Sequence, residues 1–387
     1  MIFGPDRGEL VPVNDDASIS RRMAEVARNL VAKLPDDDVR AAVVFGSVAW
    51  GDANEASDID LMLCLDRPVD YRVVTRVRVA DLLGRTFPEL PTSPVFADVD
   101  RISAEYFENA VNDGNWHGRV AHSLVLTDTD GWFADLRARV TATFHDPDVC
   151  ARRAGPWYDA SLAHSDGAHH ARADDDLTLA TLHARLALEN VAVALIETCA
   201  LRTSPTHFLA SARHALETTG LGHLYESLRR GLGLDVDLES AAYGAEAFGM
   251  LAEALRGWMA DPELVRQLGP EDVAWAVFTY ADETYEEIAH KVAALRGTGR
   301  AADLASYLDG LLKVSIRLNV GKALNLRLND SSETPKVAEF HQTLRAEHAL
   351  FDYWCRGLRL PANRAEITDA LETAAQLRDS IASRLVT

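Results

Sequence analysis

The stretch VVFGSVAWGDANEASDIDLMLCLD, residues 43–66, indicates how the first part of this chain folds. An apolar segment ending at Phe45 leads into Gly46-Ser47, and a second apolar segment runs from Ile59 to Leu65. Short apolar runs bounded by glycine and polar turn residues are typical of buried β-strands. We therefore expect two strands, the first over residues 39–45, joined by a turn-rich connection.

Two aspartates, Asp58 and Asp60, lie at the start of the second expected strand. Side chains alternate between the two faces of a strand, so both carboxylates should point to the same side. Like charges this close repel each other, and a bound cation would relieve the repulsion. Mg²⁺ prefers carboxylate oxygens and is often bound together with substrate phosphates. The pair therefore indicates a metal site rather than a solvated acidic turn.

The Gly46-Ser47 turn supplies the chemistry of a phosphate site. Gly46 has no Cβ, so its backbone can approach a ligand closely or adopt a positive φ angle. Ser47 offers a hydroxyl and a backbone N–H group. If a short helix begins at Ser47 or Val48, its first N–H groups lack intrahelical partners and can bind phosphate oxygens. Phosphate binding beside metal-binding carboxylates suits nucleotidyl transfer from a nucleoside triphosphate.

Together these segments resemble the DNA polymerase β-like nucleotidyltransferase superfamily. Its signature is an apolar residue, Gly and then Gly or Ser, followed after roughly ten residues by alternating acidic and apolar positions; residues 45–47 and 58–61 fill it. The resemblance implies a third carboxylate on a later strand. The β-prone run at residues 94–102 offers Asp98 and Asp100 on one face. We favour Asp98, which lies further inside the strand, and Asp100 is the alternative.

The resemblance also implies a mechanism and a set of ligands. Two Mg²⁺ ions held by Asp58, Asp60 and the third acid would bind the triphosphate of an NTP, with ATP favoured, and the attacking oxygen, so that pyrophosphate leaves. The third acid would bind the metal that activates the acceptor hydroxyl or act as its base. Ser57 is expected to join Gly46 and Ser47 in binding the nucleotide.

Composition limits the chemical class of the acceptor and the cellular location that we expect. The 387 residues carry a formal net charge of −20, which disfavours binding to nucleic acid backbones. We expect instead a small-molecule acceptor, a cationic one in particular. The N-terminal residues do not form a basic and apolar signal, and no apolar run approaches the length of a membrane span. The four scattered cysteines favour reduced, buried thiols, so a cytoplasmic protein without membrane contact is expected.

The pattern along the chain predicts an α+β protein with two domains. Residues 1–147 should form a small mixed-sheet nucleotidyltransferase domain, with helices expected over residues 18–34, 71–86, 103–111 and 133–144. Residues 148–387 are rich in Ala, Leu, Glu and Arg and should form an all-α helical-bundle domain. The resemblance implies that this domain binds the acceptor. This arrangement resembles small-molecule nucleotidyltransferases such as the aminoglycoside-modifying enzymes.

The helical half offers weaker candidates. The expected helix over residues 177–200 carries Thr178, Thr181, Arg185 and Glu189 along one face. Arg185 would then contact phosphate and Glu189 would act as a general base. The alternative is an ion pair inside the helix. The acidic residues 282–283 and 286–287 are expected on a solvated helix face.

Three function classes remain at this stage. The first is transfer of a nucleoside monophosphate to a hydroxyl or another nucleophile of a small molecule, in antibiotic modification or natural-product biosynthesis. The second is an adenylylating or antitoxin-type enzyme that acts on a protein partner. The third is a non-catalytic binding protein, which the complete set of acids disfavours. The sequence leaves the oligomeric state open.

Overall fold

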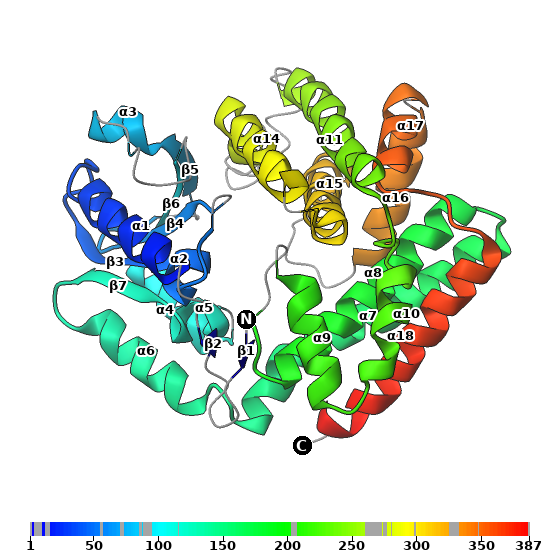
Figure 1. Cartoon of the computed structure of the whole chain (residues 1–387), viewed down its shortest axis with the longest axis horizontal. Coiled ribbons are helices and arrows are strands. Elements are labelled where there is room, and N and C mark those ends of the chain that lie inside the picture. The colour runs from blue at the N-terminus through cyan, green and yellow to red at the C-terminus, as the bar shows by residue number, and fades with distance from the viewer. Residues whose placement is uncertain are drawn as a thin grey trace. The chain divides into compact units, whose positions relative to one another are not determined.

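The chain forms two compact units (Figure 1). Unit 1 comprises Met1–Phe144 and Ala274–Ala294, and unit 2 comprises His145–Val273 and Leu295–Thr387. The computed structural model describes residues 2–3, 10–11, 16–54, 57–69, 73–84, 87, 95–114, 116–202, 207–259, 273, 277–279, 281–297, 299–324, 333–346 and 348–385. One mixed sheet and many helices confirm the expected α+β class.

Unit 1 is built around a five-stranded sheet in the order β5-β6-β4-β3-β7. Its strands are β3 (Val39–Phe45), β4 (Ile59–Leu65), β5 (Val73–Arg78), β6 (Phe96–Ser103) and β7 (Leu124–Asp128). Strands β4 and β6 are parallel, and the other neighbours are antiparallel. The segments β1 (Ile2–Phe3) and β2 (Leu10–Val11) form a separate two-stranded sheet.

The two central strands are apolar along most of their length because they are buried. Positions 41–45 of β3 and 61–65 of β4 are all buried. Helix α1 (Asp16–Val31) packs its apolar stripe, which includes Met23, Ala27 and Leu30, into the same core. The other helices of this unit are α2 (Gly46–Trp50), α3 (Val79–Leu83), α4 (Ala104–Asn112), α5 (His117–Ala121), α6 (Trp132–Thr143) and α14 (Asp282–Gly297) as far as Ala294.

The helix expected over residues 71–86 is wrong. Strand β5 occupies Val73–Arg78, and only Val79–Leu83 is helical; the expected ends at 71–72 and 85–86 lie outside the described residues. The segment VVTRVR has the β-branched content of a strand, and β5 pairs antiparallel with β6 at the edge of the sheet. Pairing with β6 therefore decides the structure of this segment.

Unit 2 is helical in all of its described elements, as expected for the later half. Helices α7 (Pro147–Ala173) and α8 (Leu177–Thr198) pack along their length as a hairpin, and α18 (Arg364–Leu385) packs against both. The remaining elements are α9 (Phe208–Thr218), the 3₁₀ turn η1 (Gly222–Leu224), α10 (Tyr225–Gly231), α11 (Leu238–Met259), α15 (Ala301–Leu324), α16 (Glu333–Ala346) and α17 (His348–Gly357).

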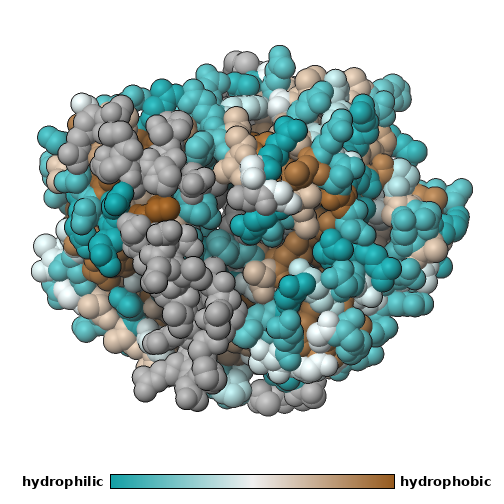
Figure 2. All heavy atoms as spheres, viewed as in Figure 1, coloured by the Kyte–Doolittle hydropathy of each residue, from teal (hydrophilic) through white to brown (hydrophobic). Residues whose placement is uncertain are grey.

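Helix α8 is apolar enough to resemble a membrane span. Among the described residues it is the one helix whose length and composition pass that test, and 78% of its most apolar window is buried inside the structure. This burial is typical of a core helix. Hydrophilic side chains cover much of the described surface on the face drawn in Figure 2, with smaller hydrophobic areas between them.

Candidate active site

Three neighbouring strands of unit 1 place one polar row across the sheet. Phe45 at the end of β3 pairs with Asp60 on β4, Asp60 pairs with Asp98 on β6, and Asp98 pairs with Arg76 on β5. Side chains at directly paired positions lie on the same face of a sheet. The register therefore sets Asp60, Asp98 and Arg76 side by side, next to the turn that follows β3.

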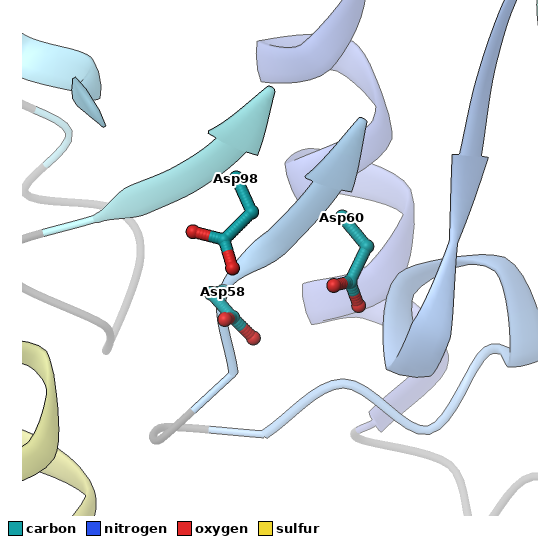
Figure 3. A group of neighbouring side chains, drawn as sticks. All are labelled: Asp58, Asp60 and Asp98. Carbon is teal, nitrogen blue, oxygen red and sulfur yellow. The ribbon is translucent and has the colours of Figure 1, made fainter. Parts of the chain in front are cut away.

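The carboxylates of Asp58, Asp60 and Asp98 form one cluster. One oxygen from each lies within 4.8 Å of the other two. Figure 3 shows Asp58 just before β4, Asp60 on that strand and Asp98 on the neighbouring strand, with the three carboxylates around a common space. The structure thus groups Asp98 with the Asp58-Asp60 pair. Asp100 pairs with Met62, two positions further along β4.

Gly46 makes room for this cluster. Its φ angle is +63°, which an L side chain rarely adopts, and a Cβ added there would lie 3.0 Å from Cγ of Asp60 and closer still to its Oδ2 atom. From the sequence, we expect the backbone of this glycine to approach a ligand. The structure shows that a side chain of the cluster itself uses the space.

The two expected serines lie at opposite ends of the connection between β3 and β4. Ser47 is a partly exposed residue of α2, which begins at Gly46, one residue before the expected start. The Ser57 hydroxyl accepts a hydrogen bond from the backbone N–H of Asn54 (2.9 Å), and the Ser57 N–H donates to the Asn54 carbonyl (3.0 Å). Ser57 therefore shapes the chain immediately before Asp58, and nucleotide binding by either serine stays a prediction.

Burial and mutual repulsion perturb the acids. Burial, reinforced by the charge of Asp58, raises the pKa of Asp60 to about 6. Burial also raises the pKa of Asp98 to about 6, although Arg76 opposes this shift. Burial disfavours ionised Asp58 too, but the charges of Lys291 and Arg76 outweigh it and hold the pKa of that carboxyl below its usual value.

Arg76 fixes the orientation of Asp98. Its Nε and one terminal nitrogen donate to the two carboxylate oxygens at 2.6 and 2.7 Å, the bidentate geometry that arginine favours. The Arg76 side chain is only 7% exposed, and its guanidinium lies 4.8 Å from the ring centre of Phe278. Sequence reasoning missed Arg76 because it placed this segment in a helix.

Helix α14 contributes two further charged residues to unit 1. Glu287 pairs with Arg76 and with Lys291, and the Lys291 ammonium also donates to Oδ2 of Asp58 at 3.3 Å. The expectation of a solvated face is wrong for Glu287, whose side chain is 4% exposed, whereas Glu286 is 49% exposed. Burial, partly offset by Lys291, raises the pKa of Glu287 to about 7. The i,i+4 spacing of Glu287 and Lys291 was the available signal, but the sequence does not show what this face packs against.

Arg185 and Glu189 lie on α8, which belongs to unit 2, whereas the three clustered acids belong to unit 1. Arg185 is buried and donates to the backbone carbonyls of Leu358 and, at 3.2 Å, Arg359. Glu189 forms an ion pair with Lys313. These contacts tie helices of unit 2 together, and the expected roles in nucleotide binding and base catalysis stay predictions.

The cluster fits a divalent cation by its chemistry. Three carboxylate oxygens are hard ligands of the kind that Mg²⁺ prefers. Burial raises the pKa of Asp60, and it raises that of Asp98 despite its pair with Arg76, so a further positive charge would favour the ionised carboxylates. Asp58, Asp60 and Asp98 are therefore the residues that would hold the metal.

Comparison with known proteins agrees with this geometry. Residues 29–95 match the family model described as Polymerase beta, Nucleotidyltransferase, which covers β3, α2 and β4. No curated protein matches the chain. A crystal structure of a nucleotidyltransferase-like protein from Exiguobacterium sibiricum aligns with 84% of this chain and 92% of its own, at 10% identity and a TM-score of 0.34. So low a TM-score does not establish a shared fold. Over residues 29–95, this chain is similar to the polymerase β nucleotidyltransferase family.

Proposed function

We propose that this protein catalyses Mg²⁺-dependent transfer of a nucleoside monophosphate from an NTP to a hydroxyl or another nucleophile of a small molecule, with release of pyrophosphate. The family match supports nucleotidyl transfer in general. The observation that carries the proposal is the cluster of Asp58, Asp60 and Asp98, whose oxygens lie within 4.8 Å of one another. ATP is the favoured co-substrate.

The three acids would bind the metal and position the acceptor in this reaction. Asp58 and Asp60 would hold the cation at the start of β4, and Asp98, oriented by Arg76, would hold it from β6 and face the attacking oxygen of the acceptor. Bound Mg²⁺ would neutralise charge on the triphosphate and lower the pKa of the acceptor hydroxyl. Gly46 keeps the Asp60 carboxylate in place by leaving space for it. Most of the rate gain would come from positioning and charge neutralisation.

The charge of the chain supports a small polar acceptor. A formal net charge of −20 repels the phosphate backbone of nucleic acids and attracts cationic molecules. We therefore propose a small cationic acceptor, and no nucleic acid or membrane partner. A cytoplasmic location, where ATP and Mg²⁺ are present, belongs to the same proposal.

Pyrophosphate release tests the proposal directly. Purified protein is incubated with Mg²⁺ and each of ATP, GTP, CTP and UTP, together with a panel of aminoglycosides and other small polar acceptors. We expect acceptor-dependent release with one nucleotide, and its loss in Asp58→Asn. Release that is unchanged in Asp58→Asn would refute the assignment of the site. Nucleotide binding without release, for every acceptor, would instead favour a protein acceptor.

A further inference from the structure

Lys291 reaches the acidic cluster from a distant part of the sequence. It lies 233 positions after Asp58, yet its ammonium donates to Oδ2 of Asp58 at 3.3 Å within unit 1. Both side chains are largely covered, with 13% of Lys291 and 15% of Asp58 exposed. An ion pair this shielded from water is screened less than a surface pair.

The pair belongs to a chain of alternating charges that runs from one acid of the cluster to another. Asp98 binds Arg76, Arg76 binds Glu287, Glu287 binds Lys291, and Lys291 binds Asp58. Each carboxylate in this chain therefore has a cation beside it. Because Glu287 contacts both cations, it keeps the Lys291 ammonium near the cluster if the contact with Asp58 is broken.

Lys291 uses a carboxylate that the metal also needs. Asp58 contributes one of the three oxygens that lie within 4.8 Å of one another, and its carboxylate is already paired with an ammonium. A lysine ammonium is a compact point charge on a flexible stem, so it neutralises a carboxylate much as a metal ion does. A divalent cation on the same carboxylate would repel the Lys291 ammonium and share its negative charge, so binding the cation would weaken the contact with Lys291.

We propose that Lys291 competes with divalent metal for Asp58, so that the protein binds metal alone weakly and binds metal together with nucleotide more tightly. The inference rests on the proposed metal site. Phosphate oxygens of an arriving nucleotide would accept the displaced ammonium, which offsets the lost pair. Metal and nucleotide would then bind cooperatively, and Lys291 would couple the two events.

The test measures binding of Mn²⁺, a paramagnetic substitute for Mg²⁺, by electron paramagnetic resonance at about pH 8, where carboxylates of ordinary or moderately raised pKa are ionised. Wild type is compared with Lys291→Met, which keeps most of the stem but removes the charge. Arg78→Met is the matched control, since Arg78 pairs with Glu286 of the same helix and contacts none of the three acids in the described contacts. Lys291→Arg restores a positive charge, and Asp58→Asn tests the metal site itself.

We expect Lys291→Met to bind Mn²⁺ at least threefold more tightly than wild type, while Arg78→Met and Lys291→Arg stay within twofold of it. With a non-hydrolysable nucleotide present, the advantage of Lys291→Met should disappear or reverse. Unchanged or weaker Mn²⁺ binding in Lys291→Met would overturn the inference, and so would an equal gain in Arg78→Met. If Asp58→Asn binds Mn²⁺ like wild type, the proposed metal site itself fails.

Discussion

Replacing Gly46 with alanine should disrupt the metal site while the protein still folds. In Gly46→Ala, the new Cβ would lie 3.0 Å from Cγ of Asp60 and nearer still to its Oδ2 atom. The backbone at the first residue of α2 fixes the position of this Cβ, so the Asp60 carboxylate has to move. Since Asp60 is one of the three clustered acids, the cluster should lose its geometry.

The expected cost has two separable parts. A non-glycine residue at φ +63° is destabilised by about 1–2 kcal/mol, which in a unit of this size lowers the melting temperature by about 2–8 °C. Gly51, at the end of α2, has φ +78° and no atom within 4 Å of an added Cβ. Gly51→Ala therefore has the backbone cost without the clash. The clash should add a loss of Mn²⁺ affinity of about 10–100-fold, typical when a ligand loses its orientation.

Two measurements on each variant separate these parts. Thermal unfolding should show similar losses for Gly46→Ala and Gly51→Ala, whereas Mn²⁺ binding and pyrophosphate release should be lost only in Gly46→Ala. Equal Mn²⁺ affinity in the two variants would refute the reasoning, because it would mean that Asp60 tolerates a Cβ or does not bind metal.

Three further predictions concern buried charges. Arg76→Met should lower the free energy of unfolding by about 3–5 kcal/mol in urea titrations, because Asp98 and Glu287 lose their shared cation, and Arg76→Lys should lose less. Asp60→Asn should abolish Mn²⁺ binding yet raise the free energy of unfolding in chelator at pH 7–8 by about 1–3 kcal/mol, because the pKa of Asp60 is raised to about 6. Burial, with help from His164, lowers the pKa of His183 to about 3. Stability should therefore fall as pH drops from about 6.5 towards 3, with a slope of up to about 1.4 kcal/mol per pH unit.

Each of these has a result that contradicts it. A stable Arg76→Met variant would mean that the two carboxylates find other partners. Loss of stability in Asp60→Asn would mean that this carboxylate supports the fold rather than repelling Asp58. For His183, stability falls with decreasing pH because the unfolded state takes up the proton more readily than the folded state. The full free energy of unfolding is therefore expected above about pH 6.5. His183→Gln should flatten the slope, and an unchanged slope would assign it to other groups.

The parts of the site that lie close together in sequence could be predicted. The bounds expected for β3 match the structure, and β4 runs over Ile59–Leu65 as expected. Asp58 and Asp60 share a face by strand alternation alone. The sequence favoured Asp98 but left Asp100 as an alternative, because both side chains point to one face of β6. The register then pairs Asp98 with Asp60 and Asp100 with Met62.

The charged residues around the three acids could not be predicted because their roles depend on long-range packing. The sequence pattern predicts a helix for the segment that contains Arg76, whereas pairing with β6 makes it a strand. Glu287 looks like a surface residue in its own helix. Glu287 is buried where α14 contacts Arg76 of the sheet, and the local sequence pattern does not indicate that contact.

The same contact implies that the sheet needs residues 274–294 to balance the negative charge of its three acids. A chain ending at residue 147 keeps the three acids and Arg76, which pairs with Asp98, but it loses Glu287 and Lys291. Without the Lys291 ammonium beside Asp58, the three carboxylates should repel one another more strongly. We expect this shortened chain to be unstable in chelator and stabilised by Mn²⁺ in proportion to its occupancy, since a ligand of the folded state shifts the unfolding equilibrium. Urea titrations with and without Mn²⁺ measure the difference. Equal stability in both conditions would show that residues 274–294 are not needed to balance the acidic cluster.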